Sequence, residues 1–463
     1  MKNKKKLNFF DIAIVGNGIM GSMLSYNLSK KKCKTVLIGP KKRAGSASTA
    51  AGAMLNVFGE IDHDIDDNEY LKRKINLGIL ASNKWRELKK NRLFNSVFTA
   101  DDTILFLSKN ATRLEKICYR SIKKFAKKYS VLITKHPKIS FLKKSKFFNA
   151  KELFMIKGEG AIDSKMLFNN FDNYFKNKKK LIYEDNLVKE ISIKKDKYKI
   201  KCINKKIFFA KKVVICNGAY LKKINFPKIK KVLDVYYGIG NALEIYDKQK
   251  KLSKHVPART VIRSPNRGST CGIHIVPRKN NEFYLGAGSQ ISHSEDYNPK
   301  IGTITYLINS FKKEIFDKIS KLNFNTVVGF RPFSFDGQPM FGEVCKNLYI
   351  ISGTKRDGLT LAPIIVDECI KKLSNKNYNS EILTGWSPLR KPISFKNIFF
   401  SSQVYIDNKV AGLLEHKEIK KKDINRVTKE LKKESILFNK RIVKSKKLNN
   451  KFAVHPELLN TFK

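Results

Sequence analysis

Features of secreted, metal-binding and membrane proteins are scarce in this sequence. Only seven of its 463 residues are cysteines, an odd number, and no CxxC pair occurs. This argues against a disulfide framework and against a zinc site, so no metal site is predicted. No apolar run reaches the roughly 18 residues that a membrane-spanning helix needs. The charged residues 1–6 lead straight into a predicted strand, unlike a secretory signal. The scattered cysteines favour a reducing, cytoplasmic location.

Acidic residues are scarce as well, with 40 Asp and Glu against 94 Lys and Arg, a formal charge of +54. The hydrophobic fraction of 42% nevertheless excludes a disordered polycation. Arginine, which grips phosphate bidentately, supplies only 15 of the basic residues, whereas lysine, a solvated point charge, supplies 79. Because the lysines are spread through every segment, we interpret the charge mainly as compositional drift. A nucleic-acid partner is left open but not favoured, and the oligomeric state is not predicted.

A βαβ unit with a glycine motif is predicted at the N-terminus. Residues 11–16 are typical of a buried strand, residues 19–30 of a helix and residues 34–38 of a second strand. Between the first strand and the helix stands a GxGxxG motif, Gly16-Asn17-Gly18-Ile19-Met20-Gly21. Its glycines allow a tight turn, backbone approach to a pyrophosphate and close helix–strand packing. Because the helix N-terminus offers N–H groups to phosphates, the motif predicts dinucleotide binding.

Which dinucleotide binds is less obvious, because the acid that usually binds the ribose is missing. Gly39-Pro40 stands in its place, followed by Lys41-Lys42-Arg43, which by itself is compatible with the 2′-phosphate of NADP. Three distant segments favour FAD instead. They are the small-residue loop at 45–54, the strand 213–216 with Gly218 after it, and the glycine-rich loop at 352–360. That last loop opens a helix whose dipole could face the flavin pyrimidine, where negative charge develops on reduction.

Other segments have readable patterns. Amphipathic helices are expected near 70–90 and 111–129, short strands between 181 and 214, and alternating strands of an antiparallel sheet from 236 to 289. A buried strand is expected at 348–353, with a helix from about residue 360. The chain after residue 390 is lysine-rich and helical in pattern, without a motif that indicates its function.

These motifs together resemble the D-amino acid oxidase (DAO) superfamily of FAD-dependent oxidoreductases, and most closely its glycine oxidase and sarcosine oxidase branch. The resemblance extends over roughly residues 9–390. The segments that carry it, besides GxGxxG, lie at 50–55, 158–163, 275–278, 285–288, 329–332, 336–339 and 356–363. Each is weak alone, but the set in this order is specific.

The resemblance implies an α/β (α+β) two-domain fold. A Rossmann-like FAD-binding domain would comprise residues 9–90, 150–225 and 326–390. An antiparallel β-sheet substrate domain would comprise 91–149 and 226–325, and 391–463 would form a helical basic extension. The cofactor-binding residues expected from the motifs are Gly16, Gly18, Ile19, Met20, Gly21, Ser46, Thr49, Ala51, Gly52, Val188, Gly218, Gly353, Asp357, Gly358, Leu359 and Thr360. No cysteine stands where the family attaches flavin covalently, so FAD is expected to be non-covalent.

The catalytic candidates are Arg331, Arg356, His63 and Tyr237. Arg331 lies in Gly-Phe-Arg-Pro, at the family position that commonly meets the substrate carboxylate, and a guanidinium matches a carboxylate well. Arg263 and Arg267 are weaker candidates, and His274 has the pattern of a packed core histidine. Around Tyr237 the sequence departs from the Arg-Gly-Gln that the family often shows, which leaves the substrate open.

The sequence thus predicts an FAD-dependent oxidoreductase that oxidises the C–N bond of a small amino acid or secondary amine by hydride transfer to the flavin. Whether it is an oxidase or a dehydrogenase stays open. Three alternatives remain: a flavin module acting on a carboxymethylamino group of tRNA, a 2-hydroxy-acid dehydrogenase, and a flavin-binding protein without turnover.

Overall fold

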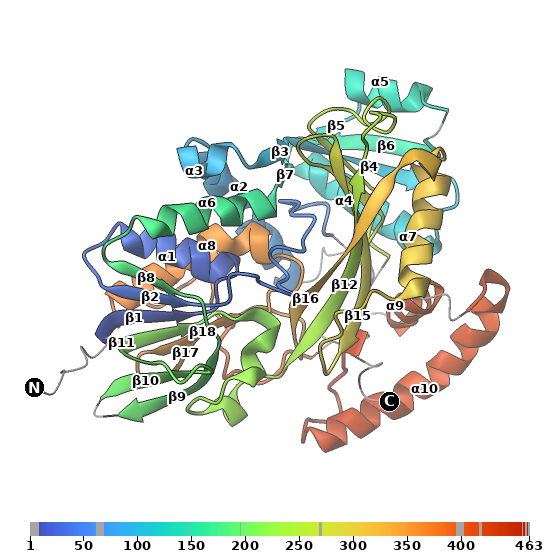
Figure 1. Cartoon of the computed structure of the whole chain (residues 1–463). Helices are drawn as coiled ribbons and strands as arrows, with labels where there is room; N and C mark the ends of the chain where they lie inside the picture. The colour runs from blue at the N-terminus through green and yellow to red at the C-terminus, as the bar shows by residue number, and fades with distance from the viewer. Residues whose placement is uncertain are drawn as a thin grey trace, which may run out of the picture. The chain divides into compact units, whose positions relative to one another are not determined.

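The computed structural model describes residues 9–61, 69–146, 148–194, 196–267, 271–394, 402–415, 419–455, 457, 458 and 461. The chain divides into two compact units (Figure 1). The first unit comprises Met1–Thr49, Lys165–Gly238 and Phe330–Pro392. The second unit comprises Ala50–Ser164, Ile239–Gly329 and Ile393–Lys463.

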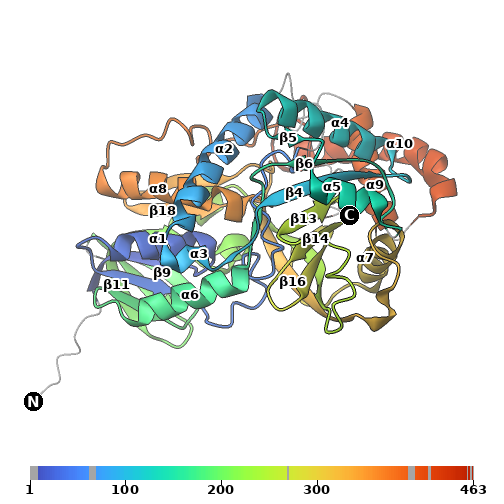
Figure 2. The same cartoon turned by 90° about the horizontal axis from the view of Figure 1, so that it is seen from above.

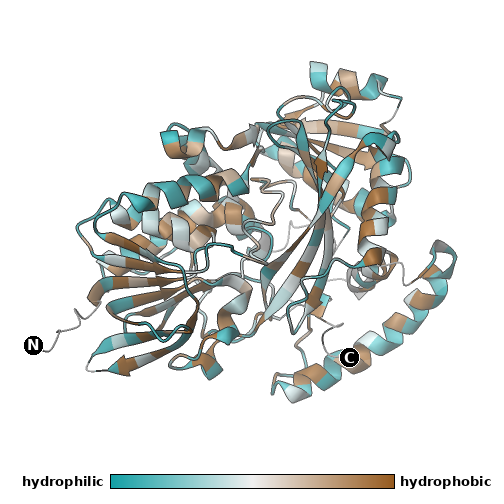
Figure 3. Ribbon diagram, viewed as in Figure 1, coloured by the Kyte–Doolittle hydropathy of each residue, from teal (hydrophilic) through white to brown (hydrophobic). Residues whose placement is uncertain are grey.

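The first unit is built on an eight-stranded sheet with the order β17-β18-β11-β1-β2-β8, extended from β11 by β10 and β9. Its strands are β1 Phe9–Val15, β2 Thr35–Ile38, β8 Leu181–Glu184, β9 Val188–Lys194, β10 Lys197–Cys202, β11 Ile207–Ile215, β17 Met340–Cys345 and β18 Leu348–Ser352. Five neighbouring strands, β18, β11, β1, β2 and β8, run parallel. Such central strands are buried on both faces, which explains why β1, β2 and β18 are nearly continuous apolar runs (Figure 3).

Helices cover one face of this sheet. They are α1 Ile19–Ser29, α6 Ser164–Lys176 and α8 Gly358–Ser374. Figures 1 and 2 show all three on the same side of the strands, and α1 packs against α8. Two short 3-10 helices, η1 Gly218–Lys223 and η2 Ile229–Lys231, follow β11. The βαβ unit predicted at the N-terminus is therefore confirmed.

The second unit contains most of another eight-stranded sheet, with the order β16-β12-β15-β14-β13-β4-β6-β5. Its strands are β4 Asp102–Ser108, β5 Leu132–Ile133, β6 Ala150–Ile156, β12 Val235–Tyr246, β13 Thr260–Arg263, β14 His274–Pro277, β15 Glu282–Ser292 and β16 Asn323–Ser334. Their pairing is antiparallel in β13–β14, β14–β15, β4–β6 and β5–β6, and parallel between β13 and β4. The mixed fold with a largely antiparallel second sheet was expected from the sequence and is confirmed.

Among the described residues before the C-terminal tail, the second unit also contains a two-stranded sheet, five α-helices and a short 3-10 helix. They are β3 Phe98–Ala100, β7 Ala161–Ile162, α2 Glu69–Lys89, α3 Arg92–Asn95, α4 Arg113–Lys128, α5 Pro137–Lys144, α7 Ile301–Glu314 and the 3-10 helix η3 Ile319–Lys321. The helices expected near 70–90 and 111–129 are α2 and α4. A capping box of Thr112 and Glu115 explains why α4 begins where it does.

The observed division differs from the predicted domain boundaries. Residues 50–90 and 150–164 belong to the second unit, not to the unit with the glycine motif, whereas residues 226–238 belong to the first. The reason is strand pairing at long sequence separation: β6 pairs with β4, and β7 pairs with β3, so these segments share one core. The assignment of FAD to one unit and substrate to the other stays a prediction.

The C-terminal tail also clusters with the second unit. Its helices are α9 Ser402–Glu415, η5 Lys421–Asp423 and α10 Ile424–Ser445. Helix α9 contacts α4, α7, α10 and β15, and it buries Ile406 and Val410. The segment after α10 buries Val454 and Leu458. The tail is thus packed onto the fold, with a largely hydrophilic α10 (Figure 3). Within the described residues, no helix combines the length and the apolar character that crossing a membrane requires.

We expect the tail to contribute to stability through its buried side chains. Leu458→Ala removes a fully buried side chain and should lower the free energy of unfolding by about 2–5 kcal/mol. Leu437→Ala, at a leucine of α10 that is 59% exposed, is the matched control and should change it by less than about 0.5 kcal/mol. Urea denaturation measures both, and equal effects of the two variants would contradict the packing described here.

Candidate functional site

Three glycine-containing turns follow three neighbouring parallel strands of the first unit. Strand β11 lies between β1 and β18, and all three run in the same direction. Gly16 follows β1, Gly218 follows β11 at the start of η1, and Gly353 follows β18. Each has a positive φ, at +107°, +63° and +69°. Because parallel strands end at the same edge of a sheet, these turns gather where open α/β sheets bind ligands.

The first of these turns has no room for side chains. A Cβ at Gly16 would lie 2.5 Å from the Cys216 carbonyl oxygen, and one at Gly21 would lie 1.8 Å from the Gly16 carbonyl oxygen. The outer glycines of the motif therefore serve close packing of the turn and α1, as the spacing predicted.

The middle glycine stands before the start of α1. A Cβ at Gly18 would meet only the Ser48 hydroxyl, at 3.2 Å, among the described residues. Gly18 is the N-cap and makes no side-chain cap, while the Ile19 amide donates to that same hydroxyl at 3.1 Å. A backbone without a side chain at a helix N-terminus suits a diphosphate. Ser48 belongs to the small-residue loop, so the structure joins two motifs far apart in the sequence.

The end of β2 explains the missing ribose acid. A Cβ at Gly39 would lie 2.5 Å from the side-chain amide of Asn17. That amide donates to the carbonyl oxygen of Pro40 at 3.0 Å and to the Tyr183 hydroxyl at 2.6 Å. Asn17 thus occupies the space that a longer residue at position 39 would need.

Arg43, the arginine that made an NADP site conceivable, is buried and already paired. Its guanidinium forms two hydrogen bonds with the Asp172 carboxylate, at 2.8 and 2.5 Å, and a third with the Asn17 carbonyl oxygen at 3.1 Å. A 2′-phosphate would have to displace Asp172 from a buried guanidinium. The Arg43 side chain is therefore not available to bind the 2′-phosphate of NADP, which weakens the NADP alternative.

Phe330, on β16, joins several predicted site segments within the first unit. Its amide donates to the Gly45 carbonyl oxygen at 2.9 Å, and it forms a parallel bridge with Ser46. The rings of Tyr220 and Tyr237 meet its ring edge-on, with centroids 6.0 and 5.8 Å away. Thus the small-residue loop, the segment after β11 and the start of β12 meet at one point.

Arg331 follows in the same strand and is half-buried. Its Nε donates to the Gly238 carbonyl oxygen at 3.4 Å, and the Lys355 amide donates to the carbonyl oxygen of Pro332 at 2.9 Å. The strand with Arg331 therefore lies beside the loop that opens α8 and contains Arg356. Of the catalytic candidates, the structure brings the segments of Arg331, Tyr237 and Arg356 together.

The start of α8 provides a second helix N-terminus in this unit. Gly358 begins the helix, the N-cap Asp357 makes no side-chain cap, and Leu359 and Thr360 are buried. The Ser352 hydroxyl donates to the Gly218 carbonyl oxygen at 3.0 Å, which ties the turn after β11 to the one after β18. These positions were expected to bind cofactor, and that role stays a prediction.

Other predicted residues lie elsewhere. His63 lies outside the described residues. Val188 is buried at the first position of β9, opposite Cys202, and its contact with adenine stays a prediction. Ala51 and Gly52 belong to the second unit, and Thr49 is the last residue before it.

The weaker arginine candidates have internal partners. Arg263 Nη1 lies 2.8 Å from a Glu60 carboxylate oxygen, and Arg267 Nε lies 2.8 Å from Glu115. His274 is packed as expected: its Nδ1 lies 2.9 Å from the Gly272 carbonyl oxygen, and its ring stacks on Tyr284. These contacts favour structural roles.

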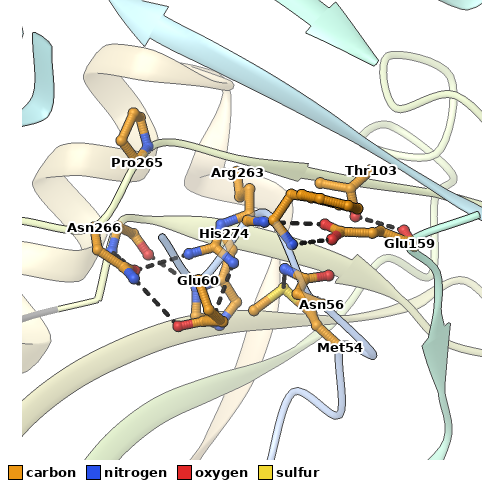
Figure 4. Close-up of polar contacts among 12 residues, drawn as sticks. Met54, Asn56, Glu60, Thr103, Glu159, Arg263, Pro265, Asn266 and His274 are labelled. Atoms are coloured by element: carbon orange, nitrogen blue, oxygen red, sulfur yellow. Dashed lines mark hydrogen bonds and ion pairs between the residues drawn. The ribbon is translucent and has the colours of Figure 1, made fainter. Parts of the chain in front are cut away.

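Glu159 is a buried ionisable residue for which the sequence patterns predicted no role. Its Oε1 accepts from the amides of Val57, at 2.7 Å, and Phe58, and its Oε2 accepts from Gly59 at 3.2 Å (Figure 4). Burial raises the pKa of Glu159 to about 7, while the three backbone N–H groups and Arg263 act in the opposite direction. A single glutamate between two glycines in an apolar segment was the signal available in the sequence.

The raised pKa of Glu159 predicts a pH-dependent stability. The folded state binds a proton that the unfolded state releases near pH 4.5, so this contribution is present below pH 4.5 and is lost as pH rises to about 7. Glu159→Gln should remove it. We expect the unfolding free energy of wild type relative to the variant to fall by up to about 3 kcal/mol over that interval. Parallel urea denaturation curves at several pH values measure this, and a constant difference would contradict it.

Solved structures with the same fold were found. Glycine oxidase from Geobacillus kaustophilus has a TM-score of 0.65 at 20% identity, over 83% of this chain and 100% of that one. Iminodiacetate oxidase from Chelativorans sp. BNC1 has a TM-score of 0.63 at 17% identity, over 81% and 98%. L-alpha-glycerophosphate oxidase from Mycoplasma pneumoniae, solved with FAD bound, has a TM-score of 0.61 at 19% identity, over 84% and 100%.

The comparison with curated proteins found no match. A family match covers most of the chain: the family described as FAD dependent oxidoreductase (DAO) matches residues 11–368. This range begins in β1, contains the three glycine turns and ends within α8. The chain therefore belongs to the DAO family of FAD-dependent oxidoreductases.

Proposed function

We propose that this enzyme oxidises the C–N bond of a small amino acid or secondary amine, with FAD held non-covalently by the first unit and the substrate carboxylate held by Arg331. The observation that carries the proposal is that Arg331 lies on a strand that is hydrogen-bonded to the small-residue loop and to the loop opening α8. Both loops belong to the glycine-rich edge described above. The names of the similar glycine and iminodiacetate oxidases support an amine substrate.

The residues present fit FAD. Gly18 lacks a side chain in front of α1, and the uncapped starts of α1 and α8 give two sets of N–H groups for negative charge. Cys216 lies behind the first turn, and burial raises the pKa of its thiol, which keeps it protonated. A neutral, buried thiol suits non-covalent binding. When bound, FAD supplies the acceptor of the hydride from the carbon that bears the amine.

The protein would then orient the substrate. The planar guanidinium of Arg331 matches a carboxylate, and its Nε bond to Gly238 fixes the plane of the group. The edge-on rings of Tyr220, Tyr237 and Phe330 help to hold the strand that carries Arg331 against the small-residue loop. Arg356 is proposed to line the same region. If the amine binds in its neutral form, no side chain has to remove a proton from carbon, and the contribution of the site is orientation and charge stabilisation.

The test is whether an amine reduces the bound flavin. The purified protein should be yellow, and FAD should be released on denaturation. Under anaerobic conditions, amino acids, N-alkyl amino acids, 2-hydroxy acids and glycerol phosphate are compared as reductants. We expect bleaching by at least one compound with an amine beside a carboxylate, and absence of FAD would refute the proposal.

The same panel separates the alternatives. Bleaching by hydroxy compounds alone would indicate a hydroxy-acid dehydrogenase. Salt-dependent binding of tRNA would indicate the tRNA module. Stable FAD that no compound bleaches would indicate a binding protein. Cytoplasmic location stays a prediction from cysteine usage.

Arg331→Ala should weaken turnover and leave FAD bound. Loss of a charged hydrogen-bond pair to the substrate carboxylate should lower kcat/KM about 10- to 100-fold. Arg331→Lys keeps the charge but not the fork, so it should recover part of the loss. Arg426→Ala, at an exposed arginine of α10, is the control and should change nothing. Steady-state kinetics with flavin absorbance at matched concentration provide the measurement, and wild-type kcat/KM in Arg331→Ala would rule out the carboxylate role.

A further inference from the structure

Residues 160–162 of the second unit pair with the loop at residues 50–60, and we call them the template of this loop. The Ile162 amide donates to the Ala53 carbonyl oxygen at 3.0 Å, and the Leu55 amide donates to the Gly160 carbonyl oxygen at 2.9 Å. Met54 and Ala161 form an antiparallel bridge between them. The template continues on the other side of Gly160, where Glu159 binds residues 57–59 through its side chain.

The Glu159 carboxylate is the point at which this pairing changes from backbone to side chain. Strand-like pairing with residues 160–162 ends at Leu55, and beyond it both carboxylate oxygens accept backbone N–H groups of residues 57–59. The Thr103 hydroxyl fixes Glu159 itself by donating to its carbonyl oxygen at 2.6 Å. Gly59 has no space for a side chain, because its Cβ would lie within 3.1 Å of Asn56, Arg263 and Glu159.

The charges around Glu159 only partly offset the free-energy cost of burying its ionised carboxylate. Arg263 pairs with Glu60 at 2.8 Å and donates to the Asn266 side chain at 2.8 Å. Arg263 is thus paired with Glu60, and it favours an ionised Glu159 only through its nearby charge. The main compensation for an ionised Glu159 is the set of three N–H dipoles.

A neutral glutamine would avoid this cost but could not make the same contacts. Its amide oxygen could accept from two of the three N–H groups, whereas its NH₂ group would face the third as donor against donor. A carboxylate therefore serves this backbone geometry better than the isosteric amide does, even though burial opposes its charge.

We propose that Glu159 is a positioning residue of the enzyme: its carboxylate holds the backbone at 57–59 and, through the template at 160–162, the flavin-side segment 50–54. The inference rests on the proposed function, together with the expectation from the sequence that Ala51 and Gly52 contact the flavin. Two further contacts hold the start of the same segment, since Arg278 donates to the Ala51 carbonyl oxygen at 2.9 Å and Tyr284 to that of Ala50 at 3.0 Å.

A positioning role predicts a pH effect as well as a mutational one. Protonation of either carboxyl oxygen places an O–H donor beside the N–H groups and weakens that oxygen as an acceptor. Turnover should therefore fall as pH drops through the neutral range, where Glu159 takes up a proton. The other charged or titratable side chains that Figure 4 labels in this cluster are Arg263 from β13, Glu60 from the loop and His274 from β14. Because the His274 imidazole is a titratable group in the same cluster, the step must be assigned with a variant.

The experiment compares Glu159→Gln with a matched control, Glu115→Gln. Glu115 is equally buried in the same unit, and its carboxylate accepts from Arg267, from the Thr112 amide and from the Thr112 hydroxyl, each at 2.8 Å. Glu115→Gln therefore disturbs a similar number of hydrogen bonds to a buried carboxylate, at a place away from the loop at 50–60. For each purified holoenzyme we would record the flavin absorption and circular dichroism spectra, and kcat and KM from pH 6 to 9 with the amine that bleaches wild type.

We expect Glu159→Gln to alter the flavin spectrum, to lower kcat at least 10-fold with KM changed less than 3-fold, and to remove the neutral step from the kcat profile. Glu115→Gln should keep all three properties of wild type. Spectra and profiles that are the same in both variants would overturn the positioning role.

If Glu159→Gln does not fold, Thr103→Val decides the matter, because it removes only the hydroxyl that fixes Glu159. It should shift the spectrum and kcat in the same direction by a smaller factor, and a wild-type spectrum and kcat would overturn the proposal. Wild type is measured first. If the wild-type protein lacks FAD or no amine bleaches its flavin, the proposed function is refuted. If wild type is active and the variants have wild-type spectra and kcat, only the role of Glu159 is refuted.

Discussion

Parallel pairing of β1, β11 and β18 is the constraint on which the candidate site depends. The register Val15–Ile215 and Ile215–Ile350 brings the ends of three strands from distant parts of the chain to one edge of the sheet. The three glycine turns lie at this edge, and helices α1 and α8 begin there. Parallel neighbours cannot be joined by a tight hairpin and need a crossover connection. Here the connections contain the segments of the second unit, so the first unit is assembled from three separate stretches of sequence.

The arginines show how charge is used inside this basic protein. Four of them have side chains that are at most 10% exposed and that pair with carboxylates, as in Arg43 with Asp172, Arg263 with Glu60, Arg267 with Glu115 and Arg390 with Asp336. Removal of one partner from such a pair leaves a buried charge, so these pairs constrain the fold strongly. The many lysines do not constrain the fold in this way. In the ion pairs that lysines form among the described residues, the lysine side chains are half-exposed or exposed. The positive charges that constrain the fold are therefore the few arginine guanidinium groups.

Much of the first unit could be predicted from the sequence because its signals are local. The GxGxxG turn, the β1–α1–β2 order and the small-residue loop are each specified by neighbouring residues. Domain boundaries were less accessible, since residues 50–61 owe their place to contacts with 159–162, a hundred positions away. Glu159 was missed for the same reason: nothing near it in the sequence shows that three amides converge on its carboxylate.

The sequence by itself determined the dinucleotide motif, the family resemblance and the short list of motif arginines, because turns, helix starts and apolar strands are encoded over a few residues. Only the tertiary structure decided which arginines are already paired, that Asn17 fills the space that a side chain at position 39 would need, and that Arg331 lies beside the loop opening α8. Ion pairs and excluded volumes join residues that are far apart in the chain, so they exist only once the strands have paired and the core has closed.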